Sequence, residues 1–306
     1  MRKYVLKRLI AAVLTMWVLI TVVFFLVRLM PGDPFQNPKM TTEIRKNMEE
    51  YYGFDKPLIV QYGNYMKNLF KGDLGYSMKF TNKTVNGIIT ESFPFSADLG
   101  IRALVFAVSF GLVLGIISAR NRGGKLDFFC VIVAVLGTSI PDFIMGALLQ
   151  YGFGIKWGLL PVAQYQGFEY TILPACAIGF YTLASVSRIM RASMLEVSSQ
   201  DYIKTARSKG VSEFRITVKH QIRNAIMPVM TMMGPTVASV LTGTFVIESI
   251  FAIPGMGKYY VESVSNNDYS MVLGMTIFYG VFLILCNLIV DILYGVADPR
   301  VRIGEK

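Results

Sequence analysis

The amino-acid sequence predicts an all-α polytopic membrane protein with six transmembrane helices and both termini in the cytoplasm. Its 306 residues are 53% hydrophobic and only 16% charged, and the mean hydropathy is +0.49. A chain of that composition is too apolar for an ordinary soluble domain. The apolar residues also gather in windows of the roughly 20 residues that a helix needs to cross a bilayer.

Six windows are long enough to span. The sixth, Phe128–Ile155, is interrupted by Pro141 and Asp142, a break that neighbouring helices can accommodate. The first window follows a basic start that resembles a signal peptide, but its apolar run is too long and no small-residue cleavage site follows. We therefore expect a retained transmembrane helix. The five uninterrupted windows are Leu9–Val27, Ala103–Ala119, Thr171–Ser187, Ala225–Ile247 and Tyr269–Val290.

The positions of the basic residues predict the orientation. With a cytoplasmic amino terminus, the inside segments hold eighteen Lys and Arg against seven Asp and Glu, a net charge of +11, while the rest of the chain sums to −1. The positive charge is spread over several loops and not gathered on one face of a soluble domain, which argues against nucleic acid as a partner. The three cysteines lie in predicted spans without metal-ligand spacing, so no metal site is expected.

A long stretch outside the membrane, residues 31–94, separates the first two spans. The pattern predicts one short amphipathic helix opening at Thr42 and closed by Gly53, and a second from Pro57 to Gly72. Their apolar faces suit either a lid on the helix bundle or a docking platform for an external partner. At the start of the second span, Asp98 and Arg102 stand one helical turn apart and favour an intrahelical ion pair.

A polar, basic stretch from Ser198 to Arg215 divides two of the most apolar segments. Ser198 or Ser199 is a candidate N-cap, Asp201 places negative charge in the first turn, and Gly210 suits the left-handed position that ends a helix. Ser212 then caps a second short helix. Such a pair on the cytoplasmic face forms a compact knob too small for a core of its own, so we expect it to be buried in a groove of another protein.

The segment Asp201 to Gly210, DYIKTARSKG, resembles the cytoplasmic EAA motif of ATP-binding-cassette importer permeases, with Lys204-Thr205-Ala206 in place of the name-giving residues. Lys204 stands where the wider superfamily has Glu, a position at which the peptide branch varies. FPFSADLG (93–100) is closest to the oligopeptide permease B-type subunit. The other stretches that resemble the peptide and nickel branch are RLMPGDPF (28–35), GDLGYS (72–77), IPDF (140–143), SRIMRASMLEV (187–197), GTFVIESIFAIPGMG (243–257), NDYSMV (267–272) and DPRVR (298–302).

The resemblance implies a type I permease fold in the bacterial cytoplasmic membrane, as one subunit of an ATP-driven oligopeptide importer. It divides the chain into a first helix (1–30), the outside segment (31–94) and a permease core (95–306) with a coupling loop at 191–224. It implies a second homologous permease subunit, two ATP-binding subunits that hold ATP and Mg, an extracytoplasmic peptide-binding protein, peptide as substrate and membrane lipid as surroundings. No cofactor is expected in this chain. The residues implied to couple to the ATPase are Asp201, Tyr202, Thr205, Ala206, Arg207 and Gly210.

Ionisable residues within spans are candidates for the translocation path. Asp142, beside the Pro141 break, and Glu248 could each favour a peptide's amino terminus, or Glu248 could satisfy backbone near the Pro254 turn. Met232 and Met233, beside Gly234 and Pro235, could form an adaptable, kinked wall of the path.

Three alternative functions can be compared with the sequence. A permease for dipeptides, nickel or another solute of the same family would look alike, because the external binding protein largely sets specificity there. A proton-coupled secondary transporter would need a relay of buried ionisable residues, for which Asp142 and Glu248 are too few. A membrane enzyme would need clustered catalytic groups. The nearest approach to an ATP-binding phosphate loop, Gly255 to Lys258, is followed by Tyr259, so ATP hydrolysis is expected on separate subunits.

Overall fold

The computed structural model describes residues 2–29, 50–80, 83–241 and 245–297, and these residues form helices and loops without a β-strand element. They divide into two compact units. The first unit holds Ser96–Pro254 and the segment from Cys286, and the second holds Arg2–Phe95 and Gly255–Leu285. Helices α4 and α14 each contribute one part to either unit.

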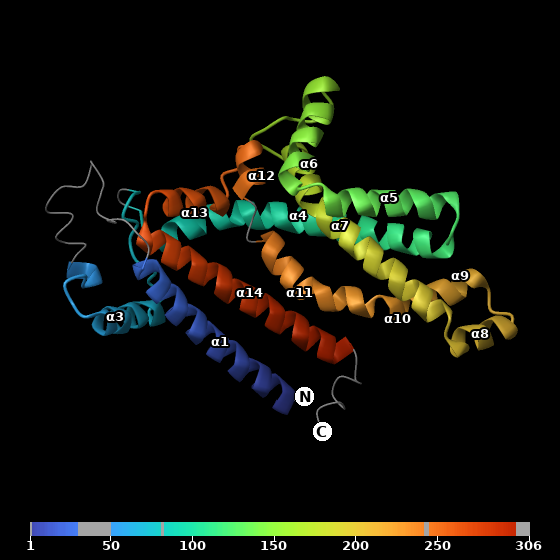
Figure 1. The fold of residues 1–306 in the computed structure, drawn as a ribbon, viewed down its shortest axis with the longest axis horizontal. Helices are drawn as coiled ribbons and strands as arrows, with labels where there is room; N and C mark the ends of the chain where they lie inside the picture. Colours follow the sequence, from blue (N-terminus) through green and yellow to red (C-terminus); the bar gives the residue numbers. More distant parts are fainter. Residues whose placement is uncertain (1, 30–49, 81–82, 242–244, 298–306) are drawn as a thin grey trace. The chain divides into compact units, whose positions relative to one another are not determined.

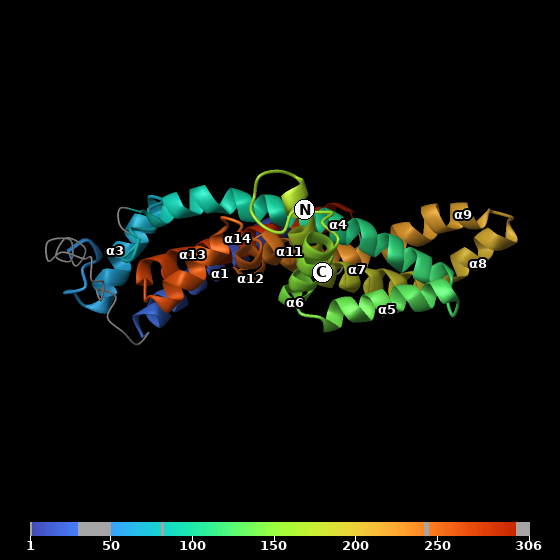
Figure 2. The ribbon, with the colours of Figure 1, turned by 90° about the horizontal axis from the view of Figure 1, so that it is seen from above.

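The first unit is organised around α7 (Glu169–Ser198), which runs beside α4 and α5 (Figures 1 and 2). Fifteen of its residues are buried, on all sides of the helix. The other elements of this unit are α4 (Val85–Arg120), α5 (Lys125–Ser139), α6 (Asp142–Leu149), the π-helix η1 (Gln150–Lys156), α8 (Asp201–Ser208), α9 (Glu213–Ile216), the π-helix η2 (Thr217–Ile222), α10 (Arg223–Ala225), α11 (Met227–Leu241) and α12 (Phe245–Ile250).

Glycines let α4 approach α7 closely. A Cβ added to Gly111 would lie 2.8 Å from the Leu183 carbonyl oxygen, and one added to Gly115 would lie 2.7 Å from that of Ser187. Real side chains cannot come so near to backbone, so only glycine fits at both positions. The small-residue spacing of Gly111 and Gly115 in the sequence thus corresponds to a tight helix contact.

The second unit packs α1 (Arg2–Arg28) against the first part of α14 (Tyr269–Ala297), with α3 (Leu58–Phe70) and α13 (Met256–Ser265) beside them. Phe24 is fully buried there, and Tyr62 and Tyr65 of α3 pack against the same cluster. The Thr21 and Tyr62 hydroxyls share a hydrogen bond of 2.7 Å. The predicted helix after Pro57 is therefore confirmed, and its apolar face covers α1.

The other predicted outside helix, opening at Thr42, lies outside the described residues except for its last turn. Residues 50–52 are helical, and Gly53 follows with φ of +63°. The next helix, α4, already begins at Val85, within the stretch expected to lie between the first two spans. It starts before the apolar window does because hydropathy marks the part of a helix that can lie in lipid, not the part that is helical.

Five helices of the described chain are long and apolar enough to cross a membrane, and α5 with α6 makes a sixth if the pair counts as one span. These two helices meet at an angle of 112° at the break predicted around Pro141. Ile140 and Pro141 have extended backbone there, and the helix restarts at Asp142. The intrahelical pair is also confirmed: Arg102 Nε lies 2.7 Å from Asp98 Oδ2, and Tyr165 donates to the same carboxylate at 2.6 Å.

Candidate functional site

The polar insert forms a knob at the end of α7, made of α8 and α9 (residues 201–216), as Figures 1 and 2 both show. Gly210 ends α8 with φ of +74°. Its N–H donates to the Arg207 carbonyl at 2.9 Å, and the Val211 N–H donates to the Ala206 carbonyl at 3.2 Å. Together these two bonds form a Schellman motif, which stops the helix sharply and turns the chain into α9.

The prediction that Ser198 or Ser199 caps α8 is wrong. The N-cap residue is Gln200, and Ser198 is the last residue of α7. The Ser198 hydroxyl donates to the Met194 carbonyl at 2.6 Å, and that of Ser199 donates to the Glu196 carbonyl at 2.7 Å. Both serine hydroxyls therefore bond carbonyl groups in the last turn of α7 instead of the first N–H groups of α8.

The knob is held together by two buried side chains and an ion pair. Ile203 of α8 and Ile216 of α9 are fully buried. Arg207 binds Glu213 through two bonds, Nε–Oε1 at 2.7 Å and Nη2–Oε2 at 3.2 Å, and so joins α8 to α9. The Arg207 guanidinium lowers the pKa of Glu213, which keeps the carboxylate charged and the bidentate pair formed.

One hydrogen bond connects the knob to α10: Asn224 donates to the Tyr202 hydroxyl at 3.2 Å. Beside the knob, Gln221 of η2 donates at 2.9 Å to Ser198 at the end of α7. Cavities of about 530 and 540 Å³ adjoin the knob. Arg120, Arg122 and Arg207 are among the residues of the first, and Tyr202 and His220 are among those of the second. The knob is thus hydrogen-bonded to the neighbouring helix, and two cavities lie beside it.

Most of the residues expected to couple to a partner lie on the surface of the knob. Asp201, Tyr202, Thr205, Arg207 and Gly210 are exposed. Ala206 is half-buried. Lys204 binds Asp201 at 2.9 Å in the first turn of α8, and this partner lowers the pKa of Asp201.

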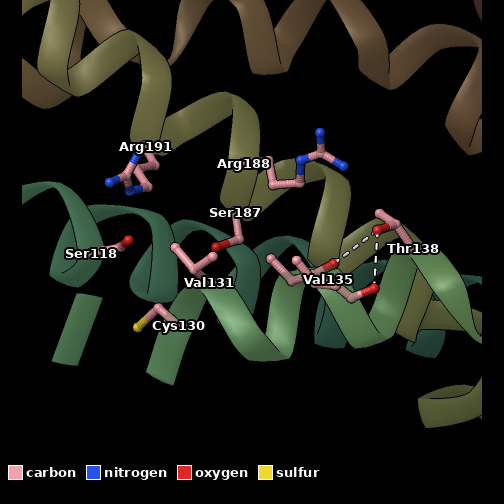
Figure 3. A pocket seen from close by; sticks show the side chains of 9 residues that line it. Ser118, Cys130, Val131, Val135, Thr138, Ser187, Arg188 and Arg191 are labelled. Carbon is pink, nitrogen blue, oxygen red and sulfur yellow. Dashed lines mark hydrogen bonds between the residues drawn. The ribbon is translucent and has the colours of Figure 1, made fainter. Parts of the chain in front are cut away.

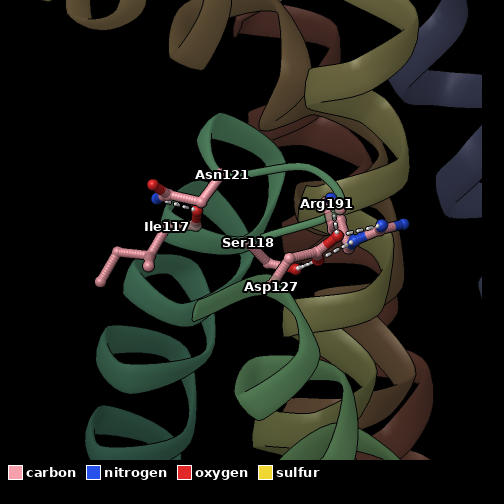
Figure 4. Close-up of polar contacts among 6 residues, drawn as sticks. Ile117, Ser118, Asn121, Asp127 and Arg191 are labelled. Carbon is pink, nitrogen blue, oxygen red and sulfur yellow. Dashed lines mark hydrogen bonds and ion pairs between the residues drawn. The ribbon is translucent and has the colours of Figure 1, made fainter. Parts of the chain in front are cut away.

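A buried carboxylate fixes the base of α5 to α7 (Figure 4). Asp127 is 5% exposed and receives both nitrogens of a bidentate bond from Arg191, each at 2.9 Å. The Ser118 hydroxyl of α4 and the Gly123 N–H also donate to Asp127. This one side chain therefore joins α4, α5 and α7 near the end of α7 that leads into the knob.

The expected path residues do not come together at one point. Asp142 is half-buried and accepts a hydrogen bond of 2.8 Å from the Phe143 N–H at the start of α6. Glu248 of α12 is fully buried and accepts from the Ser96 hydroxyl at 2.7 Å. Met232 and Met233 are half-buried on α11. Whether any of these four residues meets a transported molecule stays a prediction.

A cavity of about 460 Å³ lies between α4, α5 and α7 (Figure 3). Its walls are mostly aliphatic, with hydroxyl groups from Ser118, Thr138 and Ser187. Two arginines of α7, Arg188 and Arg191, also line it.

Sequence reasoning assigned Asp127, Arg188 and Arg191 only to the positive-inside charge pattern and missed these contacts. One signal was present for the first of them. Asp127 is an acidic residue just after a basic loop, at the start of an apolar window, where an unpaired carboxylate would be costly. Its partner lies 64 positions further along the chain, and no local pattern identifies it.

The chain is similar to known proteins along its whole length. Residues 111–303 match the family model described as binding-protein-dependent transport system inner membrane component, and residues 1–100 match the model for the N-terminal part of such membrane components. The dipeptide transport system permease protein DppB of Bacillus subtilis (strain 168) is 46% identical over 307 residues, covering 100% of both chains.

Oligopeptide transport system permease proteins are similar along their full length as well. OppB of Haemophilus influenzae is 42% identical and OppB of Escherichia coli (strain K12) is 40% identical, each covering 99% of this chain and 100% of the relative. A solved structure, "Crystal structure of an amino acid ABC transporter with histidines", superposes with a TM-score of 0.54 at 14% identity, over 68% of this chain and 94% of that one. This last likeness concerns the fold alone.

Proposed function

The chain belongs to the family of binding-protein-dependent transport system inner membrane components, and from this premise we propose that it is the transmembrane permease subunit of an ATP-driven peptide importer. It is a multi-pass protein of the bacterial inner membrane and acts as a transport subunit. Full-length relatives named as dipeptide and as oligopeptide permeases support peptides as the substrate class.

The knob of α8 and α9 is the observation that carries the proposal. In this function α8 is the coupling helix, seated in a cleft of a cytoplasmic ATP-binding subunit. Its exposed Asp201, Tyr202 and Thr205 contact that subunit, and the sharp Schellman turn at Gly210 makes the short helix a rigid lever. Closure of two ATP-binding subunits on ATP and Mg then moves α7 through the knob and opens the path to the other side.

The path itself is formed with a second homologous permease subunit, and an extracytoplasmic binding protein delivers the peptide. This chain supplies movement and a conduit, and the ATP chemistry takes place on the partners. Asp142, Glu248, Met232 and Met233 remain the candidates within the spans. Of these, Asp142 is half-buried beside the 112° break between α5 and α6, where discontinuous helices commonly mark a transport site.

Affinity purification in mild detergent from the native membrane tests the assignment. The wild type is compared with a variant whose residues 201–210 are replaced by a Gly/Ser linker. We expect ATP-binding subunits, identified by mass spectrometry and by ATPase activity of the eluate, to accompany the wild type and to be lost from the variant. The second permease subunit should remain with both, because α8 lies outside the spans.

A pair of point variants separates coupling from folding. Gly210→Pro is incompatible with φ of +74°, because proline fixes φ near −65°. It should leave the protein inserted but reduce transport by more than tenfold. Gly158→Pro imposes the same conflict at φ of +60°, in a loop far along the chain from the knob, and should retain transport. Transport that survives both the linker and Gly210→Pro would contradict the coupling role.

A further inference from the structure

The cavity between α4, α5 and α7 contains an arginine without a partner (Figure 3). Two guanidinium groups line it, three positions apart on α7. Arg191 is held by the bidentate bond to Asp127. Arg188 is exposed, and among the described residues its guanidinium forms no hydrogen bond or ion pair. The sequence counted Arg188 among the cytoplasmic charges, one residue beyond the predicted span, but the structure continues the candidate membrane-spanning helix to Ser198. Cations in such helices face a cavity or a partner and mark a path or a site.

Arg188 lies farther from the knob than Arg191 does, on the same helix. It lies ten residues before the end of α7 at Ser198, which is about 15 Å along a helix axis at about 1.5 Å per residue. Arg191 and the basic turn between α4 and α5 lie closer to that end, which the charge pattern predicts to be cytoplasmic. In Figure 3 the Arg188 side chain extends towards the Thr138 end of the cavity, whereas Arg191 lies at the Ser118 end. The Arg188 side chain therefore extends away from the end of α7 that leads into the knob.

The cavity suits a small amphipathic molecule with one negative charge. Its volume of about 460 Å³ is within the range of about 300–1,000 Å³ typical of ligand sites. Val131, Ala134 and Val135 offer a smooth aliphatic wall, which tolerates side chains of many shapes. Thr138 and Ser187 add hydroxyl groups beside the guanidinium. A peptide varies in its side chains, but its C-terminal carboxylate is constant.

We propose that Arg188 binds the C-terminal carboxylate of the transported peptide as the peptide passes this cavity. The proposal rests on the peptide-importer function and adds a specificity-determining residue to it. Guanidinium and carboxylate match in charge and in planar geometry, and such a bond recognises every peptide without reading its sequence. Arg191 is not assigned this role because Asp127 already pairs with its charge through a bidentate bond from Nε and Nη2.

Uptake by the complete transporter, purified with its partner subunits and reconstituted into liposomes, tests this role. The probes are trialanine and trialanine C-terminal amide, at saturating binding protein. The variants are Arg188→Gln, Arg188→Lys and, as a control for loss of positive charge, Lys125→Gln, which removes an exposed cation at the start of α5 outside the cavity. All share one binding protein, so its own preference between the two peptides cancels in the comparison.

We expect Arg188→Gln to slow trialanine uptake about tenfold, the factor associated with one charge-assisted hydrogen bond, and to leave uptake of the amide unchanged. Arg188→Lys should retain part of the preference for trialanine over its amide, and Lys125→Gln should retain all of that preference. An equal loss for both peptides, or no loss for either, overturns the proposal. The proposal is also overturned if the loss of uptake depends on the fraction of anionic lipid in the liposomes and not on the peptide terminus, because Arg188 would then bind lipid. It is overturned as well if the second permease subunit is missing from the Arg188→Gln complex. A wild-type complex that imports neither peptide overturns the proposed function itself.

Discussion

Single carboxylates connect parts of the chain that are far apart in sequence. Asp268, fully buried, receives hydrogen bonds from the Ser77 hydroxyl and from the N–H groups of Met78, Lys79 and Met271. Ser77 ends the GDLGYS stretch, and Asp268 lies in NDYSMV, so two of the sequence stretches that carry the family resemblance meet at this residue. A carboxylate with two acceptor oxygens is the side chain that satisfies four donors at once.

Replacing this carboxylate by an amide is expected to weaken the fold. In Asp268→Asn one oxygen becomes an NH₂ group, which faces a donor such as the Lys79 N–H, so the protein should lose about 1–3 kcal/mol. Thermal unfolding of the detergent-solubilised protein measures the effect. Asp55→Asn, at an exposed aspartate, is the matched control and should be neutral. Equal melting temperatures for wild type and Asp268→Asn would contradict the role given to the carboxylate.

The same residue predicts a dependence on pH. Burial raises the pKa of Asp268 above its ordinary value, against the pull of its hydrogen bonds. The folded protein therefore binds this proton more tightly than the unfolded chain, and the contribution to stability falls as pH rises through that window. Lowering the pH from neutrality towards the raised pKa should widen the difference in melting temperature between wild type and Asp268→Asn.

Between helices, glycine decides how close the axes can come. Gly111 and Gly115 of α4 face α7 carbonyl groups, and Gly179 of α7 faces the Ala103 carbonyl in return, at 2.7 Å from its added Cβ. Each of the two helices therefore places glycine against the backbone of the other. The same helix, α7, lines the cavity with Arg188 and leads into the knob.

Adding one methyl group at this interface should therefore be destabilising. A Cβ at Gly115 would lie 2.7 Å from both the Ser187 carbonyl oxygen and the Met190 Cβ, neither of which can move freely. Gly115→Ala should cost about 1–3 kcal/mol through overpacking. Gly63→Ala, in α3 with nothing within 4 Å, should instead stabilise the helix slightly. Melting curves of the two variants check the signs, and a Gly115→Ala variant as stable as wild type would contradict the close approach.

For the whole molecule, the proposed ATP-driven function can be compared with the placement of ionisable groups. The buried Asp127–Arg191 and Ser96–Glu248 contacts each join helices, and the knob exposes Asp201, Lys204 and Arg207 on its surface. This arrangement suits ATP-driven conformational change better than proton-coupled transport.

An uncoupler distinguishes the two energy sources. In liposomes holding the complete transporter and an ATP supply, collapse of the proton gradient should leave peptide uptake at about its original rate. A secondary transporter would stop under the same conditions. Measuring ATP inside the liposomes during the assay serves as the control, because an uncoupler that also depletes ATP would stop either kind of carrier. Uptake that ceases with ATP maintained would favour proton coupling.

Sequence patterns were enough to predict the class of the protein, the spans, the break at Pro141, the Asp98–Arg102 pair, α3 and the turn at Gly210. These features depend on periodicity, composition and residues within a few positions of one another, so local interactions are sufficient to specify them. The α8 cap was misassigned, because whether a serine bonds the helix before it or after it depends on where α7 ends. The pairing of Asp127 with Arg191, the contact of Asp268 with Ser77 and the position of Arg188 in a cavity follow from the folded chain and not from any local pattern. A charged residue in a span is costly without a partner, but which partner lies close enough to bind it depends on how the chain folds.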